Sequence, residues 1–248
     1  MIVLGLVLAL AIGISLGLLG GGGSILTVPV LHYVIGIEAH DAIATSLVVV
    51  GLTSMVALVP HARAKAVQWR LGVAFGGASM ASAFLGGRLG ELIPSLVLII
   101  AFAVVMLAAG IAMLVRARRP LLACDSDQVS LPRVLVIGVG VGLVTGTLGA
   151  GGGFIIVPAL ALVGGLGMRE AVGTSLLVIA MNSFAGVAGT ASHATIDLKI
   201  TVGVTAVAIV GSLVGVLIGR RLAAQHLQRA FGWFVIIVGI AILFRELG

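Results

Sequence analysis

Charged residues are scarce in this sequence. Only 9% of its 248 residues are Asp, Glu, Lys or Arg, whereas a soluble globular domain has about 25%. Hydrophobic residues make up 60%, and the mean hydropathy is +1.32. A soluble core has no room for so much apolar surface, so the composition excludes that class and indicates an integral membrane protein.

Cysteine and the usual chemical motifs are also scarce. Cys124 is the only cysteine, so no intrachain disulfide can form. The glycine run at 20–23 follows an apolar segment rather than a strand, and no Gly-Lys-Ser/Thr follows it, which excludes a nucleotide-binding loop. No metal cluster or nucleophile–base pair is recognisable. We therefore expect no enzyme, no cofactor and no metal.

Carboxylates are missing from the middle of the apolar runs. All eight Asp and Glu residues fall in loops or at segment ends, which argues against a proton relay inside the membrane. The runs themselves are continuous and approach the roughly 20 residues that a helix needs to cross a bilayer. Because strands of a transmembrane barrel alternate in polarity instead, the sequence predicts an all-α membrane fold.

The chain repeats itself at an offset of 129 residues. Residues 17–31 match residues 146–160 in eight of 15 positions, and the Thr-Ser dipeptide at 45–46 matches the one at 174–175. Such self-similarity predicts two copies of one structural unit. The expected organisation is a first membrane repeat at 1–119, a polar connecting loop at 120–131 and a second membrane repeat at 132–248.

Each repeat contains about five hydrophobic segments. In the first repeat they span residues 2–19, 24–37, 42–60, 71–90 and 94–115. The 14 residues of the second segment rise only about 21 Å as a helix, against roughly 30 Å of hydrocarbon. We therefore expect a glycine-tipped helical hairpin to open each half, with its tip inside the membrane, where protein or a watery cavity must surround it.

Basic residues predict the orientation of the halves. If each hairpin turns back, the halves are inverted and one side of the membrane collects 11 of the 14 Lys and Arg residues. If the hairpin were one broken crossing, the halves would be parallel and the division would be 9 against 5. The positive-inside rule favours inversion and places both termini outside the cytoplasm. The same rule accounts for the net charge of +6 without a nucleic-acid partner.

The glycine runs are candidate anion sites. Backbone N–H groups at a helix N-terminus bind anions, and glycine leaves them uncovered. In a low-dielectric membrane two such tips would hold a small oxyanion without burying a full positive charge. The candidate residues are Gly20, Gly21, Gly22, Gly23 and Ser24 in the first half and Gly149, Gly151, Gly152 and Gly153 in the second. Alternatively, the glycines only allow a tight turn and close packing.

Hydroxyl and amide side chains follow on the next segment of each half. Thr45, Ser46, Thr174, Ser175 and Asn182 are candidate donors to the same anion. The competing interpretation is that these hydroxyls bond back to their own helix or across to a neighbour.

The doubled pattern Gly-x-Leu-Gly-x-Gly-Gly-x-x-x-x-Val-Pro-x-Leu, with a Thr-Ser pair downstream, resembles the TauE/SafE sulfite exporter family. The likeness covers essentially the whole chain. It implies export of sulfite or a small organosulfur anion, such as a sulfonate, across the inner (plasma) membrane of a bacterium, with the glycine runs lining the path. Residues 65–69 depart from the family pattern, because they lack the glycine and acid expected there.

The resulting hypothesis is a multi-pass transporter for a small sulfur-containing anion, whose partners are that substrate and the lipid bilayer. Two alternatives stay open. One is a channel or transporter for another solute, including a cation held on glycine carbonyls. The other is a membrane partner subunit without transport activity. The oligomeric state is left open.

Overall fold

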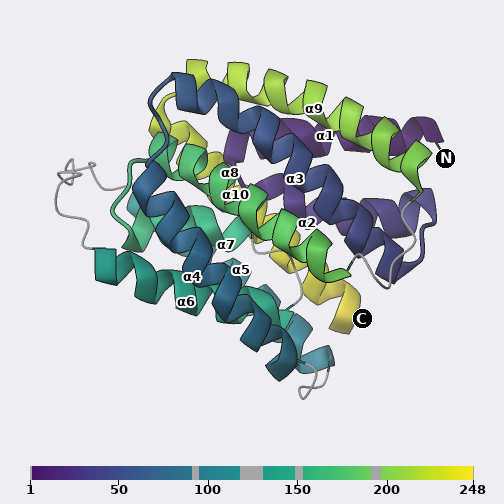
Figure 1. The fold of residues 1–248 in the computed structure, drawn as a ribbon, viewed down its shortest axis with the longest axis horizontal. Helices are drawn as coiled ribbons and strands as arrows, with labels where there is room; N and C mark the ends of the chain where they lie inside the picture. The colour runs from purple at the N-terminus through teal and green to yellow at the C-terminus, as the bar shows by residue number, and fades with distance from the viewer. Residues whose placement is uncertain (1, 91–94, 118–130, 149–152, 191–196, 248) are drawn as a thin grey trace.

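The computed structural model describes residues 2–90, 95–117, 131–148, 153–190 and 197–247. Every regular element in these ranges is a helix, which confirms the predicted all-α class. The first half contains α1 (Ile2–Leu19), α2 (Gly22–Pro29), η1 (Val30–Ile35), α3 (Ala39–Arg63), α4 (Trp69–Gly90) and α5 (Ser95–Ala117). The second contains α6 (Leu131–Leu148), α7 (Gly153–Pro158), η3 (Ala159–Val163), α8 (Met168–Thr190), α9 (Leu198–Arg221) and α10 (Ala224–Leu247) (Figure 1).

The helices of the two halves pack in a repeated pattern. α1 packs along α9, and α6, its equivalent, packs along α4. The remaining large contacts join equivalent helices directly, α3 with α8 and α5 with α10 (Figure 1). Exchanging one half for the other therefore leaves the list of packed pairs unchanged. The repeat in the sequence is thus also a repeat in packing.

The contacts also define the directions of the packed helices. Gly51 of α3 lies beside Ser183 of α8, and Leu47, one turn earlier on α3, lies beside Gly186, further along α8. α3 and α8 consequently run antiparallel, and the contacts between α5 and α10 have the same sense. α1 and α9 instead run parallel, as do α4 and α6.

Glycine brings the backbones of the parallel pairs into contact. A β-carbon at Gly13 or Gly17 of α1 would overlap the carbonyl of Ala208 or Ser212 of α9, and Gly142 of α6 approaches α4 in the same way. Small residues at such positions let membrane helices approach closely, where dispersion contacts drive association.

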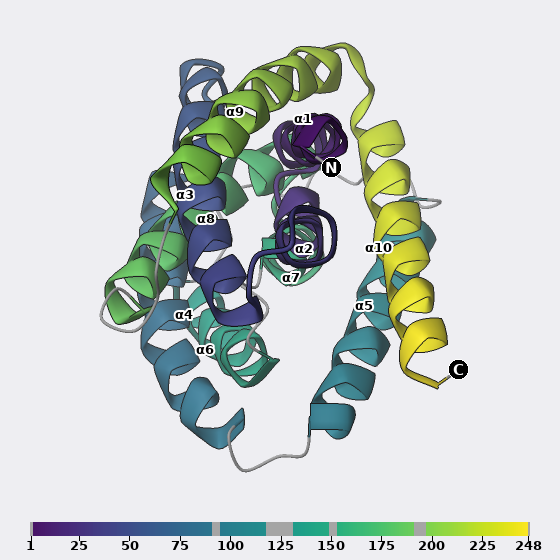
Figure 2. The ribbon, with the colours of Figure 1, turned by 90° about the vertical axis from the view of Figure 1, so that its right-hand side faces the viewer.

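α2 and α7 occupy the interior of the bundle. Figure 2 shows both surrounded by the longer helices, and the two contact one another. Pro29 ends α2 and Pro158 ends α7, and each is followed by a π-helical turn, η1 or η3. Proline removes a backbone donor and clashes with the carbonyl four residues earlier, so a wider turn after it relieves the crowding. The Val-Pro pair of the repeated motif therefore has the same effect in both halves.

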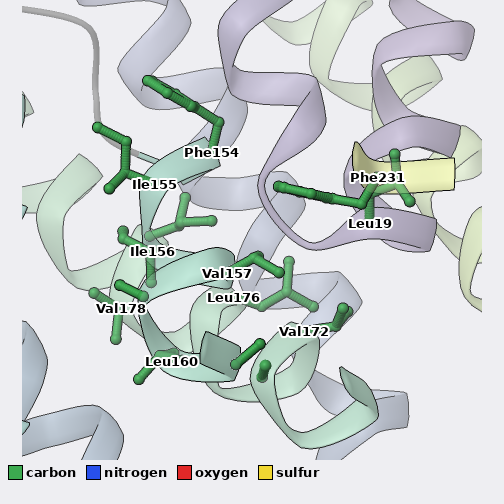
Figure 3. Close-up of a cluster of buried hydrophobic side chains, with 14 of the residues drawn as sticks. Leu19, Phe154, Ile155, Ile156, Val157, Leu160, Val172, Leu176, Val178 and Phe231 are labelled. Carbon is green, nitrogen blue, oxygen red and sulfur yellow. The ribbon is translucent and has the colours of Figure 1, made fainter. Parts of the chain in front are cut away.

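The hydrophobic core is centred on α7, whose residues are all buried. Phe154 near the start of α7 and Leu160 in η3 belong to one buried cluster with Leu176 of α8. Phe231 of α10 and Leu19 of α1 belong to the same cluster (Figure 3). A short helix that is apolar on every side belongs in a protein interior. This packing fixes the position of Gly153 at its N-terminus.

The outer surface of the bundle is apolar. Val136 is 72% exposed and Phe244 is 82% exposed. Among the described residues, four helical stretches are long and apolar enough to cross a membrane: Asp41–Arg63, Met168–Ala188, Leu198–Arg221 and Ala224–Phe244. An exposed apolar surface around a bundle of such helices is suited to lipid.

Basic side chains link three helices at one end of the bundle. Arg220, in the last turn of α9, donates a hydrogen bond of 2.6 Å to the carbonyl of Pro60 in α3. Arg169, in the first turn of α8, donates to the carbonyls of Arg220 and Leu222 at 3.3 and 3.1 Å. The C-terminal ends of α3 and α9 and the N-terminal end of α8 therefore lie together.

Candidate functional site

The first glycine run reverses the chain between α1 and α2. Gly20 has a φ of 78°, a conformation that L side chains rarely adopt. A β-carbon there would also lie 2.6 Å from the Oγ of Ser175 on α8. α2 then returns along α1, because Gly23 contacts Ile12 and Leu16. Only glycine satisfies both the backbone conformation and the contact at position 20.

The tips of the two halves touch. A β-carbon at Gly21 would overlap the carbonyl of Gly153, and one at Gly153 would lie 3.3 Å from the carbonyl of Gly21 and close to the Oγ of Ser24. A β-carbon at Gly22 would instead lie 3.0 Å from the ring of Phe234 on α10. The predicted site residues Gly149, Gly151 and Gly152 lie outside the described residues.

Most hydroxyls near the tips donate their protons to the backbone. The Oγ of Ser24 donates to the carbonyl of Gly21 at 2.8 Å, that of Ser46 to Ile43 at 2.7 Å, and that of Ser175 to Val172 at 2.8 Å. A hydroxyl carries one proton, so in this conformation these side chains have lone pairs left but no donor. The competing interpretation made from the sequence holds for Ser46 and Ser175.

Thr174 lies on a different side of α8 from Ser175. Its Oγ1 accepts a hydrogen bond of 3.0 Å from the backbone nitrogen of Gln68, and the Nε2 of Gln68 donates to Glu170 at 3.1 Å. The connection between α3 and α4 is thereby attached to the first turns of α8. Thr45, the equivalent of Thr174, is buried on α3. Thr174 is therefore joined to this connection, while Ser175 faces Gly20.

Asn182 lies near the middle of α8, where its Oδ1 accepts a hydrogen bond of 3.2 Å from the Oγ of Ser79 on α4. The bond leaves the amide nitrogen with its two N–H donors on the other side of the side chain. Because Ser79 has one hydroxyl proton, it shares this proton between Asn182 and the carbonyl of Gly76, which lies 3.0 Å from its Oγ. The amide is thus oriented by α4.

Three buried hydroxyls that the candidate site residues do not include lie at the same level of the bundle. Thr53 and Ser54 of α3 and Thr205 of α9 are 1%, 0% and 6% exposed, and their hydroxyls have no hydrogen-bond partner among the described residues. The repeat carried a signal for them, since Thr53 stands at the position of Asn182 and Ser54 at that of Ser183. No hydroxyl can be assigned a free proton from sequence, because that depends on its rotamer.

Full charges are kept away from this region. Of the carboxylates whose positions the structure describes, Glu38, Asp41, Glu170 and Asp197 lie at the ends of α3, α8 and α9. No group of three or more potential metal ligands occurs among the described residues. The arrangement therefore offers neutral groups, backbone amides and hydroxyls, at mid-depth in the bundle.

The chain is similar to a family of membrane transporters along nearly its whole length. The profile of the sulfite exporter TauE/SafE family matches residues 5–242. A "Probable membrane transporter protein" of Xylella fastidiosa is 35% identical over 95% of this chain and 92% of its own length. "Probable membrane transporter protein YdhB" of Bacillus subtilis is 27% identical over 94% of this chain and 96% of its own length. No solved structure gives a significant match.

The family match agrees with the doubled glycine motif, with the all-helical fold and with the four long apolar helices. The resemblance inferred from the motif is confirmed. This chain belongs to the sulfite exporter TauE/SafE family of membrane transporters.

Proposed function

We propose that the protein moves a small sulfur-containing anion, such as sulfite or a sulfonate, across the membrane through a site between the two glycine tips. The contact of Gly21 with Gly153 carries the proposal, because only a backbone without side chains brings the two tips together there. Backbone amides and neutral donors suit an oxyanion in a low-dielectric interior. Export from the cytoplasm across a bacterial inner membrane is the direction implied by the family name.

We further propose that the two halves are inverted in the membrane. The equivalent pairs α3 with α8 and α5 with α10 run antiparallel, as halves related by an axis in the membrane plane require. Arg169 and Arg220 of the second half lie beside Pro60, near the basic residues that follow α3 in the first half. A parallel arrangement would put these two sets on opposite sides of the membrane.

The basic end of the bundle then faces the cytoplasm and both termini face the other side. Both chain ends are drawn at the same end of the bundle in Figure 1. Epitope tags at residues 1 and 248 should be accessible from outside the cytoplasmic membrane in intact spheroplasts. Protection of either tag until the membrane is permeabilised would contradict the inverted arrangement.

Sulfite flux into proteoliposomes tests the transport proposal. The wild-type chain should move sulfite or methanesulfonate well above the rate of empty liposomes, and Gly21→Ala should reduce the rate at least about tenfold, the effect of losing about 1.4 kcal/mol of binding free energy. Gly203→Ala is the matched control, because a β-carbon at Gly203 meets nothing within 4 Å. Wild-type flux at the background level for every sulfur anion would contradict the proposal.

Gly110→Ala separates transport from packing. A β-carbon at Gly110 would lie 2.6 Å from the side chain of Ile236 and 2.9 Å from the carbonyl of Gly232, in the contact between α5 and α10. This substitution should lower thermal stability while the protein that folds keeps its substrate affinity. If Gly110→Ala and Gly21→Ala lower affinity equally, the glycine tips have no special role.

A further inference from the structure

Most hydroxyls in the interior of this bundle share one hydrogen-bonding pattern. Hydroxyls in membrane helices commonly donate to a carbonyl three or four residues earlier. Ten of them do so here: Ser15, Ser24, Thr27, Ser46, Ser79, Ser82, Thr145, Ser175, Thr201 and Ser212. Thr53, Ser54 and Thr205 are as deeply buried, yet their hydroxyls have no partner among the described residues.

These three hydroxyls lie on two helices that pack together, α3 and α9. Thr53 and Ser54 are adjacent, and they follow Val49, which clusters with Val204 and Ala208 of α9. Thr205 occupies the repeat position of Gly76, whose contact on α8 is Met181, the equivalent of residue 52. Thr205 therefore belongs to the face of α9 that meets α3 at residues 52–53.

The hydroxyls also lie near the level of the glycine tips. On α8, Ile179 contacts the tip residue Gly153, and Val172 and Ser175 contact Gly20. The antiparallel register, in which Gly51 is beside Ser183, brings residue 180 opposite Ser54. An anion between the tips is consequently within about two helical turns of this hydroxyl pair in depth, and nearest to it on the side of Gly153.

The equivalent contact, between α8 and α4, differs at two of these positions. At the position of Thr53 it has Asn182, whose oxygen accepts from Ser79, and Ser79 stands at the position of Ala208. The position of Thr205 is a glycine, Gly76. Asn182 and Ser79 are thus bonded to one another between α8 and α4, whereas Thr53 and Thr205 have no partner among the described residues.

An unpaired buried polar group lowers the stability of the folded protein by about 1–3 kcal/mol. Helix packing alone does not explain why three such groups lie close together. Each hydroxyl can donate one proton, and an oxyanion offers several oxygens that accept. No carboxylate of the described residues lies at this level, so a cation would lack a countercharge.

We propose that Thr53, Ser54 and Thr205 donate hydrogen bonds to the oxygens of the transported anion and form a selectivity surface at the contact between α3 and α9. This proposal rests on the proposed transport function. The glycine tips contribute backbone amides from both halves, and the hydroxyl surface adds donors on one side. The binding site is then asymmetric within a symmetric scaffold.

Binding and stability measured together test the proposal. The variants are Thr53→Val, Ser54→Ala and Thr205→Val, and the control is Ser212→Ala, which removes a buried hydroxyl of α9 that is already bonded to Ile209. Without ligand, the three variants should unfold at the same temperature as the wild type or higher, because an unpaired group is removed. Each should bind sulfite or methanesulfonate about tenfold more weakly, and the control should change affinity less than about twofold.

A panel of sulfite, methanesulfonate, nitrate, formate and phosphate separates this proposal from the transport function. Wild-type binding of a non-sulfur oxyanion alone, weakened in the variants, would uphold the hydroxyl surface and refute the sulfur substrate. Tight sulfite binding that the variants retain would refute the hydroxyl surface and leave the transport function standing. No oxyanion binding at all would refute both. A Na⁺-dependent stabilisation lost in the variants, with anion affinity intact, would assign the hydroxyls to a cation and overturn the proposal.

Discussion

Ser79 and Asn182 bond to each other between α4 and α8, whereas the equivalent positions between α9 and α3 hold Ala208 and Thr53. The helices around the two pairs pack alike. The difference therefore lies in chemistry rather than in scaffold. A repeat determines where helices cross. Single side chains then determine whether the polar groups at a crossing bond to each other or are left to bind a ligand. In membrane transporters with repeated halves, the site lies where the halves meet.

The largest effect on stability is expected at Gly20, in the tip between α1 and α2. Gly20→Ala should lower the free energy of unfolding by about 3 kcal/mol, because a positive φ costs about 1–3 kcal/mol and the new β-carbon would lie 2.6 Å from Ser175. Thermal unfolding in detergent measures it. Gly77→Ala on α4 is the control, since nothing lies within 4 Å of its β-carbon. Equal stability of the two variants would contradict this account of the tip.

Making the contact between α3 and α9 resemble that between α8 and α4 should lower anion affinity and raise stability. The double variant Thr53→Asn with Ala208→Ser places the amide–hydroxyl pair of the α8–α4 contact between α3 and α9. It should raise stability by about 1 kcal/mol through the new hydrogen bond and weaken anion binding about tenfold. Calorimetry and thermal unfolding on the same preparation measure both. Unchanged anion affinity would show that Thr53 does not touch the substrate.

Breaking the bond between α4 and α8 should have a smaller effect. Ser79→Ala removes the donor to Asn182 and should lower stability by about 1 kcal/mol. Ser82→Ala on the same helix is the matched control, because Ser82 donates to its own backbone at Ala78 and Ser79. If the two variants unfold alike, the bond between α4 and α8 contributes nothing beyond the usual return to the backbone.

The smallest effect on transport is expected at Glu170, in the first turn of α8. Glu170 accepts from Gln68 at 3.1 Å and from the backbone nitrogen of Gly167 at 3.4 Å, as a first-turn acid does. Glu170→Gln keeps an acceptor oxygen, so sulfite flux should stay within about twofold of the wild type. A flux reduced more than tenfold in folded protein would give this carboxylate a direct part in transport.

Apolar runs predicted the helices well because a membrane helix must be apolar along its length. The expected segment at 2–19 is α1, and the expected short segment at 24–37 is α2 with η1, shifted by two residues. The π-helical turns after Pro29 and Pro158 were not predicted, since a sequence shows the proline but not how the following turn widens.

The site was harder to predict than the helices. Glycine runs marked the tips, but which glycine touches the opposite tip depends on how α2 and α7 cross, and the structure gives Gly21 with Gly153. The Thr-Ser pairs were chosen for their hydroxyls, yet Ser46 and Ser175 donate to their own helices. In the sequence, Thr53 and Ser54 stand among residues as apolar as those around the Thr-Ser pairs. Only the side-chain geometry of the structure shows that the hydroxyls of Thr53 and Ser54 have no partner among the described residues.

The central claim is that one oxyanion binds between the tips at the level of Thr53 and Ser54. Anomalous diffraction from crystals grown with selenite, the heavier analogue of sulfite, tests it most directly. We expect a single selenium peak placed so that the oxygens of the selenite reach hydrogen-bonding distance of the backbone near Gly21 or Gly153 and of at least one of the two hydroxyls. A peak confined to the basic end near Arg169 and Arg220, or no peak at selenite concentrations that block sulfite flux, would contradict the account.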